Sequence, residues 1–257
     1  MTPLEYWKPE TFEISSYQHN LSERINQSYN GSGSDNTGKC LYTYNSLGFR
    51  GNEPTKEGFR IMSIGCSITE GVGLNDNETW SHQFSKLVPN GVDLNFGVGG
   101  RSNDYISRVI LSYYDMIKPD LVLIMYTETH RREFYNKDGG IEPFHHKKWG
   151  YFNENELGIL EHDAHLTLLN KNNNFINWYK NHMLIKLFLE SKKCNWLWNG
   201  WFATSDYNDE NRFDGDYYPF KDFGVDGYHP GPNHNKEYAH KLYDFIVENS
   251  PHIIKQL

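Results

Sequence analysis

The sequence has 257 residues, which is enough for one large α/β domain or two small ones. Aromatic residues make up 16% of the chain, which argues against disorder, and the net charge of −8 argues against a general nucleic-acid binder. No apolar run reaches the roughly 18 residues that a membrane-spanning helix needs, so we expect no membrane partner.

The start of the chain lacks a basic patch followed by an apolar stretch, so the sequence predicts no secretory signal. Three cysteines (Cys40, Cys66 and Cys194) are too few for a disulfide framework or a cysteine metal cage. A cytoplasmic location is therefore the default expectation, and association with a virion is the alternative.

Residues 1–58 contain no long periodic element, and the run Asn30–Asn36 is rich in turn-forming residues. We expect an irregular lead-in that packs on the main domain and is anchored by Gly48–Gly51. Residues 59–257 are predicted to form that main domain. The stretch at about 131–170, rich in His, Asn and aromatics, is predicted to be an inserted surface layer.

Short apolar runs and apolar stripes alternate along the main domain. The runs predict four strands, at Arg60–Ile64, Val92–Phe96, Leu121–Met125 and Trp196–Trp198. The stripes predict four helices: one capped by Asn77 with Trp80, Phe84 and Leu87 on one face, one over Ile106–Ile117, one with Phe175, Ile176, Tyr179, Met183 and Leu187 on one face, and one over Tyr238–Ile246. This alternation implies parallel strands with helices on both faces of the sheet.

Functional groups gather at the carboxyl ends of the strands in such sheets. Ser67 follows the first strand, where a neighbouring base could reach its hydroxyl. Near the other end of the chain, Asp226 precedes His229 by three residues, so its carboxylate could hold the imidazole Nδ1–H and leave Nε2 to accept the serine proton. Each motif alone also fits a purely structural role, but the order Ser, Asp, His favours a catalytic triad.

A glycine-rich turn, Gly97–Gly100, follows the second strand. Backbone N–H groups at such turns can stabilise a developing oxyanion. A dinucleotide fingerprint would require a further glycine where this chain has Asn103, so we discount nucleotide binding.

The arrangement resembles the SGNH, or GDSL-type, hydrolase superfamily. The resemblance lies in the blocks Gly65–Ile68, Asn95–Ser102 and Asp226–His229, together with the upstream stretch Asn45–Gly51. It implies a three-layer α/β/α sandwich with a flavodoxin-like parallel sheet of about five strands. It also implies ester hydrolysis without a metal or cofactor, and an oxyanion hole built from the backbone N–H groups of Ser67 and Gly100.

Two positions depart from the family pattern. Cys66 stands where an Asp is usual. In the third block, Thr129 stands at the place of an Asn, and a threonine hydroxyl donates only one proton. Asn103 and Arg131 are further candidates for the missing oxyanion donor.

Two other features bear on ligands. His162 and His165 have the spacing of metal ligands, and Asp214, Asp216 and Asp222 contain calcium-type oxygens, but neither set matches a known site, so we expect no metal. Aromatic residues that could stack on sugars, or fill the core, are Trp149, Tyr151, Trp198, Trp201, Tyr217 and Tyr218.

The sequence thus predicts a serine esterase that removes a small acyl group, acetyl by preference, from a carbohydrate or small-molecule ester. The competing hypothesis is a module of the same fold with little or no activity, which binds glycans or serves as a structural protein of a particle surface.

Overall fold

The computed structural model describes residues 28–32, 39–135, 141–144, 170–200, 207, 209–213 and 219–255. Within these ranges four parallel strands form a sheet in the order β4-β3-β5-β8. The strands are β3 (Phe59–Ile64), β4 (Gly91–Asn95), β5 (Leu121–Tyr126) and β8 (Asn195–Gly200). The first strand of the sheet, β3, therefore lies between β4 and β5, and the connections after β3 and β5 leave in opposite directions. In parallel sheets this switch point is where ligands bind.

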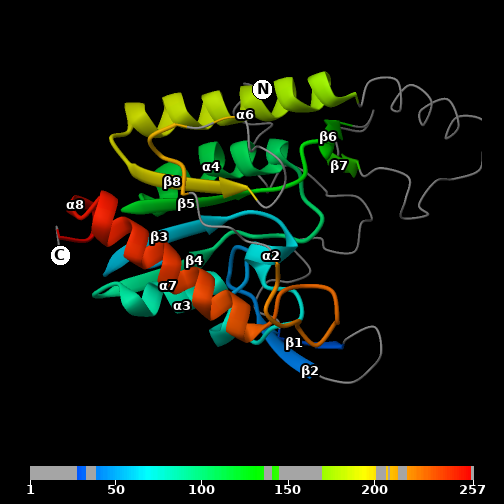
Figure 1. The fold of residues 1–257 in the computed structure, drawn as a ribbon, viewed down its shortest axis with the longest axis vertical. Helices are drawn as coiled ribbons and strands as arrows, with labels where there is room; N and C mark the ends of the chain where they lie inside the picture. The colour runs from blue at the N-terminus through cyan, green and yellow to red at the C-terminus, as the bar shows by residue number, and fades with distance from the viewer. Residues whose placement is uncertain are drawn as a thin grey trace, which may run out of the picture.

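Helices cover both faces of the sheet (Figure 1). On one face α4 (Asn103–Ile117) packs against α6 (Lys171–Ser191), and on the other α3 (Trp80–Leu87) packs against α7 (Pro232–Asn249). The shorter helices are α2 (Ser67–Glu70), the 3-10 turn η3 (Asp76–Glu78) and α8 (His252–Lys255). The predicted α/β/α sandwich with a parallel sheet is confirmed.

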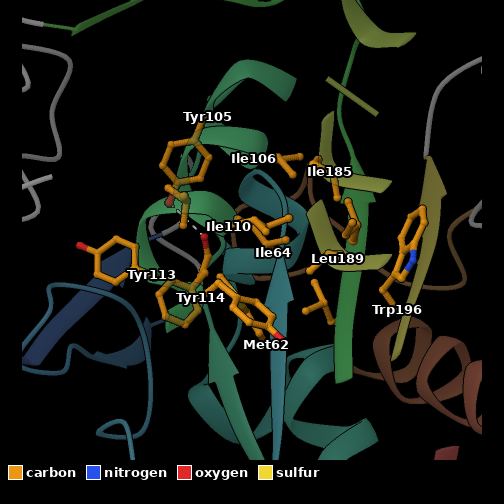
Figure 2. Packing of buried hydrophobic residues seen from close by; sticks show 14 of the residues in the cluster. Met62, Ile64, Tyr105, Ile106, Ile110, Tyr113, Tyr114, Ile185, Leu189 and Trp196 are labelled. Atoms are coloured by element: carbon orange, nitrogen blue, oxygen red, sulfur yellow. Dashed lines mark hydrogen bonds between the residues drawn. The ribbon is translucent and has the colours of Figure 1, made fainter. Parts of the chain in front are cut away.

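The sheet buries both faces because its side chains alternate between two hydrophobic cores. Met62 and Ile64 of β3 point toward α4 and α6, where they meet Ile106, Ile110 and Leu189 (Figure 2). Their neighbour Ile61 belongs to the opposite core, with α3 and α7. Such strands are continuous apolar runs rather than alternating ones, which is why the sequence pattern predicted them.

Two small antiparallel pairs accompany the sheet. β1 (Ser28–Ser32) pairs with β2 (Lys39–Thr43), in the segment where we expected irregular structure. β6 (Arg132–Tyr135) pairs with β7 (Ile141–Phe144), inside the region predicted to be an insertion. None of the helices in the described ranges combines the length and apolar character needed to cross a bilayer.

The strand count differs from the prediction of about five. The described residues supply four strands, and the place beyond β8 is taken by a segment that makes one parallel bridge, between Trp198 and Arg212. The N–H of Phe213 donates to the Trp198 carbonyl at 2.8 Å, and the N–H of Trp198 donates to the Asn211 carbonyl at 2.9 Å. Asp209 also accepts the Trp198 indole N–H at 2.8 Å, so a side-chain hydrogen bond adds to the short backbone bridge at this edge.

The predicted cap of α3 was wrong. Asn77 lies in η3, and Thr79 caps the helix by accepting the N–H of His82 at 3.3 Å. Both residue types are good N-caps, and the 3-10 turn between them was not visible in the apolar pattern.

Helix α6 exists as predicted, but the face expected to be buried is the exposed one. Ile176 is 54% exposed and Leu187 is 60% exposed. The buried residues are Trp178, Asn181, His182, Ile185 and Leu189. His182 is buried because its Nε2 pairs with Asp209 at 3.0 Å and its Nδ1 with the Tyr126 hydroxyl at 3.2 Å.

Candidate active site

Ser67 is the first residue of α2, at the carboxyl end of β3. Gly65 makes the turn between them, because a Cβ there would meet Thr69 Oγ1 at 2.2 Å and the Met125 carbonyl oxygen at 2.8 Å. The Ser67 side chain is half-buried, and its hydroxyl donates only to Cys66 Sγ, at 3.9 Å, among the described residues. Sulfur is a weak acceptor, so the serine hydroxyl keeps freedom to turn.

The glycine-rich turn after β4 is fastened directly onto α2. The N–H of Gly99 donates to Glu70 Oε2 at 2.6 Å, and Asn95 Nδ2 donates to the Thr69 carbonyl at 2.7 Å. A Cβ on Gly99 would lie 3.7 Å from Cβ of Ser67, so the turn is in contact with the serine.

Two backbone N–H groups, one in α2 and one in the glycine-rich turn, make no hydrogen bond within the described part of the chain. They are the N–H of Ser67, at the start of α2, and the N–H of Gly100, which has a φ of +73°. A φ in this region suits glycine and turns the peptide away from the preceding strand direction. These donors fit the role of an oxyanion hole.

Asp226 and His229 form the other half of the site. Oδ2 of Asp226 lies 2.5 Å from Nδ1 of His229, and Oδ1 accepts the backbone N–H of His229 at 3.1 Å and of Tyr228 at 3.2 Å. Burial alone would raise the pKa of the Asp226 carboxyl, but these hydrogen bonds and the histidine charge outweigh it, and the pKa is lowered. A carboxylate held ionised in this way fixes the imidazole orientation.

The loop that carries this pair is closed on itself and on α7. The N–H of Gly224 donates to the His229 carbonyl at 2.8 Å, and the N–H of Gly231 donates to the Asp222 carbonyl at 2.8 Å. The Asp222 carboxylate accepts the N–H of Asn233 at 3.0 Å and of His234 at 2.8 Å. Asp222, considered above as a calcium-type oxygen, therefore caps α7.

The two halves meet at Gly73, in the loop that follows α2. The carbonyl of Gly73 accepts the N–H of Val225 at 3.0 Å, and a Cβ on Gly73 would meet Asp226 Oδ1 at 2.9 Å. The loops of Ser67 and of His229, from distant parts of the sequence, are thus adjacent. No hydrogen bond joins Ser67 to His229 in the structure, so the Asp–His half of the predicted triad is formed and the Ser–His contact is open.

The three additional oxyanion candidates lie at the end of β5. Asn103 is 1% exposed, and its amide exchanges two hydrogen bonds with the backbone of Thr127, at 3.0 and 3.1 Å. It therefore fastens α4 to β5. Thr129 lies in a turn and its carbonyl accepts from Arg132 at 2.5 Å. Arg131 pairs with Glu128 at 3.1 Å.

Sequence reasoning missed Glu70, Arg50 and Tyr42. Glu70 is 2% exposed and holds the glycine turn, while Arg50 is 1% exposed and binds the loop after α2. The available signal for Glu70 was a charged residue on a very short helix beside the serine. For Arg50 it was its place in Gly48–Gly51, the predicted anchor, and in Asn45–Gly51, part of the family resemblance.

Some of the predicted sugar-binding and metal-ligating residues lie among the described residues, and the others lie outside them. Trp198 is 1% exposed and packs in the core, so it does not face a sugar. No cluster of three or more metal-ligating side chains occurs among the described residues. Outside the described residues lie His162, His165, Asp214, Asp216, Trp149, Tyr151, Trp201, Tyr217 and Tyr218.

No protein-family model matches the sequence, and no curated protein matches it. Solved structures similar to this chain include a family 3 carbohydrate esterase from Clostridium thermocellum, with 15% identity, a TM-score of 0.38 and coverage of 77% of this chain and 100% of that one. A member of the lipolytic protein G-D-S-L family from Veillonella parvula has 13% identity, a TM-score of 0.34 and coverage of 73% and 98%. A GDSL-like lipase from Bacteroides thetaiotaomicron has 15% identity, a TM-score of 0.32 and coverage of 77% and 92%.

Two of these names belong to the GDSL-type family that the sequence blocks resemble. At such identities and TM-scores, the activities of these proteins do not transfer to this chain. Its function has to be argued from its own site.

Proposed function

We propose that this chain is a serine esterase of the SGNH type, with Ser67 as nucleophile, His229 as general base and Asp226 as the residue that holds the imidazole. The observation that carries the proposal is the 2.5 Å hydrogen bond between Asp226 and His229, on a loop fastened beside that of Ser67. With Nδ1–H bound to a carboxylate, Nε2 is left to accept a proton, and the imidazolium that forms is stabilised by the carboxylate charge.

The open contact between Ser67 and His229 is compatible with this role. Catalytic hydrogen bonds are often long or unformed in a ligand-free protein and tighten when substrate binds. Among the described residues the Ser67 hydroxyl is bonded only to Cys66 Sγ, so rotation about its Cα–Cβ bond breaks only one weak hydrogen bond. Substrate binding can therefore bring the Ser67 hydroxyl into hydrogen-bond contact with His229.

The reaction then follows from the donors of the site. Ser67 Oγ attacks the ester carbonyl while His229 takes its proton, and the oxyanion is held by the N–H groups of Ser67 and Gly100. Collapse expels the alcohol, which receives the proton from His229, and leaves an acyl-serine. A water activated by His229 hydrolyses this acyl-enzyme. Thr129 is retained only as a candidate third donor.

The substrate we propose is a small acyl ester, acetyl by preference, on a carbohydrate. Tyr228, next to His229, is 71% exposed although its backbone is held by Asp226. Phe223, on the same loop, is 57% exposed. Rigidly mounted, solvent-facing rings beside a catalytic base suit stacking against a sugar.

The test is hydrolysis of p-nitrophenyl acetate and longer esters by wild type and Ser67→Ala, with fluorophosphonate labelling followed by intact mass. The matched control is Ser191→Ala, which changes an exposed serine at the end of α6. The proposal requires turnover and a single label in wild type and control, and loss of both in Ser67→Ala. Equal turnover in all three proteins would overturn it.

One observation favours a second candidate function. Because Ser67 and His229 share no hydrogen bond, the chain could be a glycan-binding module without activity. Absence of turnover and labelling in wild type, together with binding of acetylated oligosaccharides measured by calorimetry, would select this function instead.

A further inference from the structure

The segment before the sheet reaches the loop that follows the Ser67 helix. Arg50 is 1% exposed, and its guanidinium donates to three backbone carbonyls, one at the end of that helix and two in the loop. They are Glu70 at 2.8 Å, Gly71 at 2.6 Å and Leu74 at 2.5 Å. Nε of the same side chain binds Asp76 Oδ1 at 2.6 Å.

The Glu70 carbonyl lies at the carboxyl end of α2, which has only four residues. The Gly71 carbonyl also accepts the N–H of Leu74, at 3.1 Å. A helix leaves its last carbonyls unpaired, and one this short has few internal hydrogen bonds to hold its shape. The planar guanidinium presents several donors in a fixed fork, which an ammonium group cannot reproduce. Arg50 therefore fixes the path of the chain as it leaves α2.

Tyr42 extends this contact to Gly73. Its ring lies under the Arg50 guanidinium, at 3.9 Å from ring centroid to Cζ, and its hydroxyl oxygen accepts the N–H of Gly73 at 2.7 Å. Asp76 ties the assembly to β2, since its Oδ2 accepts the N–H of Thr43 at 3.0 Å and the Thr43 hydroxyl at 2.5 Å.

Gly73 in turn is the residue on which the Asp226 loop rests. Its carbonyl binds Val225 and its Cα faces the Asp226 carboxylate. A continuous set of contacts thus runs from Arg50 and Tyr42, through the loop after α2, to the Asp226–His229 pair. Displacing Gly73 would move the histidine relative to Ser67.

We infer that Arg50 is a positioning residue of the active site, supported by Tyr42, which sets the distance between Ser67 and His229. This inference rests on the proposed function. Buried charge is expensive, and an apolar side chain would fill the same space. All of the Arg50 hydrogen bonds described above go to the end of α2, the loop after it and Asp76, so its charge serves to hold that loop.

The test compares Arg50→Lys and Tyr42→Phe with the control Arg60→Lys. Arg60 also pairs with an aspartate, Asp120, and binds a carbonyl, but at the amino end of β3. For each protein, kcat and KM for p-nitrophenyl acetate, the melting temperature and the low-field proton NMR signal of the His229–Asp226 hydrogen bond are measured.

We expect Arg50→Lys to lower kcat by about tenfold to a hundredfold in the folded protein, because small misplacements of catalytic groups have effects of this size. KM should change little, and the low-field signal should shift or broaden. Tyr42→Phe should give the same changes to a smaller extent, and Arg60→Lys neither. A folded Arg50→Lys protein with wild-type kcat and an unshifted signal would overturn the inference.

The NMR signal separates this inference from the proposed function. If wild type shows no Ser67-dependent turnover, the esterase proposal fails, but the signal still reports whether Arg50 positions the Asp226–His229 pair. If turnover is present and only the melting temperature responds to Arg50→Lys, the residue is structural and the positioning role is refuted.

Discussion

Gly73 and Asp226 are in direct contact, and a Cβ added to Gly73 would meet Asp226 Oδ1 at 2.9 Å. We therefore predict that Gly73→Ala lowers kcat at least tenfold by displacing the carboxylate that holds His229. It should also lower the free energy of unfolding by about 1–2 kcal/mol, because its φ of +81° disfavours residues with a Cβ. Esterase assays and urea unfolding measure the two effects separately.

The matched control for this prediction is Gly58→Ala. Gly58 has a φ of +76°, and a Cβ there would meet the Asn90 carbonyl oxygen at 2.7 Å, but it precedes β3 at the far end from Ser67. It should lose similar stability and keep its activity. Equal loss of kcat in both variants would mean that Gly73 acts only through stability.

The sequence predicted those parts of the fold that depend on local pattern. The strand β5 is a continuous apolar run between turn residues, so its position could be predicted from the sequence alone. Helix α6 shows the limit, because both of its faces carry large apolar side chains. The buried face includes His182, which pairs with Asp209 in a contact between distant segments that no periodicity encodes.

The site divides in the same way. The spacing of Asp226 and His229 was readable because the two side chains share one tight loop. The contacts that bring this loop to Ser67 pass through Gly73, in the loop after α2, and through Tyr42 and Arg50, in the segment before the sheet. Arg50 and Tyr42 bind backbone carbonyls and N–H groups. Every residue type carries these groups, so the sequence does not indicate which of them will be bound.

A second prediction concerns Asp93, a buried carboxyl on β4. It is 6% exposed, Oδ2 accepts the Ser81 hydroxyl at 3.3 Å, and Oδ1 has no partner among the described residues. Burial raises its pKa to about 7, against the lowering effects of Ser81 and Arg50. The unfolded chain therefore ionises first, and stability should fall as pH rises from about 4, the ordinary aspartate value, to about 7.

Asp93→Asn removes this titration. We expect its free energy of unfolding to exceed that of wild type at pH 8 by on the order of 4 kcal/mol, and to match it closely at pH 4. Urea unfolding at both pH values measures the difference, with Asp115→Asn, an exposed aspartate, as control. A variant less stable than wild type at pH 8 would contradict the assignment.

A third prediction concerns Asp209, whose titration has the opposite sign. Burial would raise its pKa, but hydrogen bonds from His182 and Trp198 and the charge of Lys186 lower it to about 2. Its contribution to stability is therefore complete above pH 4 and lost as pH falls toward 2. Asp209→Asn should lower the free energy of unfolding at pH 7 by about 2 kcal/mol, with little difference left near pH 2. A loss independent of pH would point to packing alone.

A fourth prediction tests the carbohydrate part of the proposed substrate through Tyr228. If its exposed ring stacks on a sugar, Tyr228→Ala should raise KM for an acetylated oligosaccharide by roughly threefold to tenfold, since aromatic stacking contributes about 0.5–1.5 kcal/mol. Turnover of p-nitrophenyl acetate, which offers no sugar, should stay within about twofold of wild type. The control is Leu187→Ala, which removes another exposed apolar side chain, on α6, and should affect neither substrate. An equal loss on both substrates would mean that Tyr228 supports the loop of His229 rather than the sugar, and wild-type KM for the oligosaccharide would exclude Tyr228 from binding it.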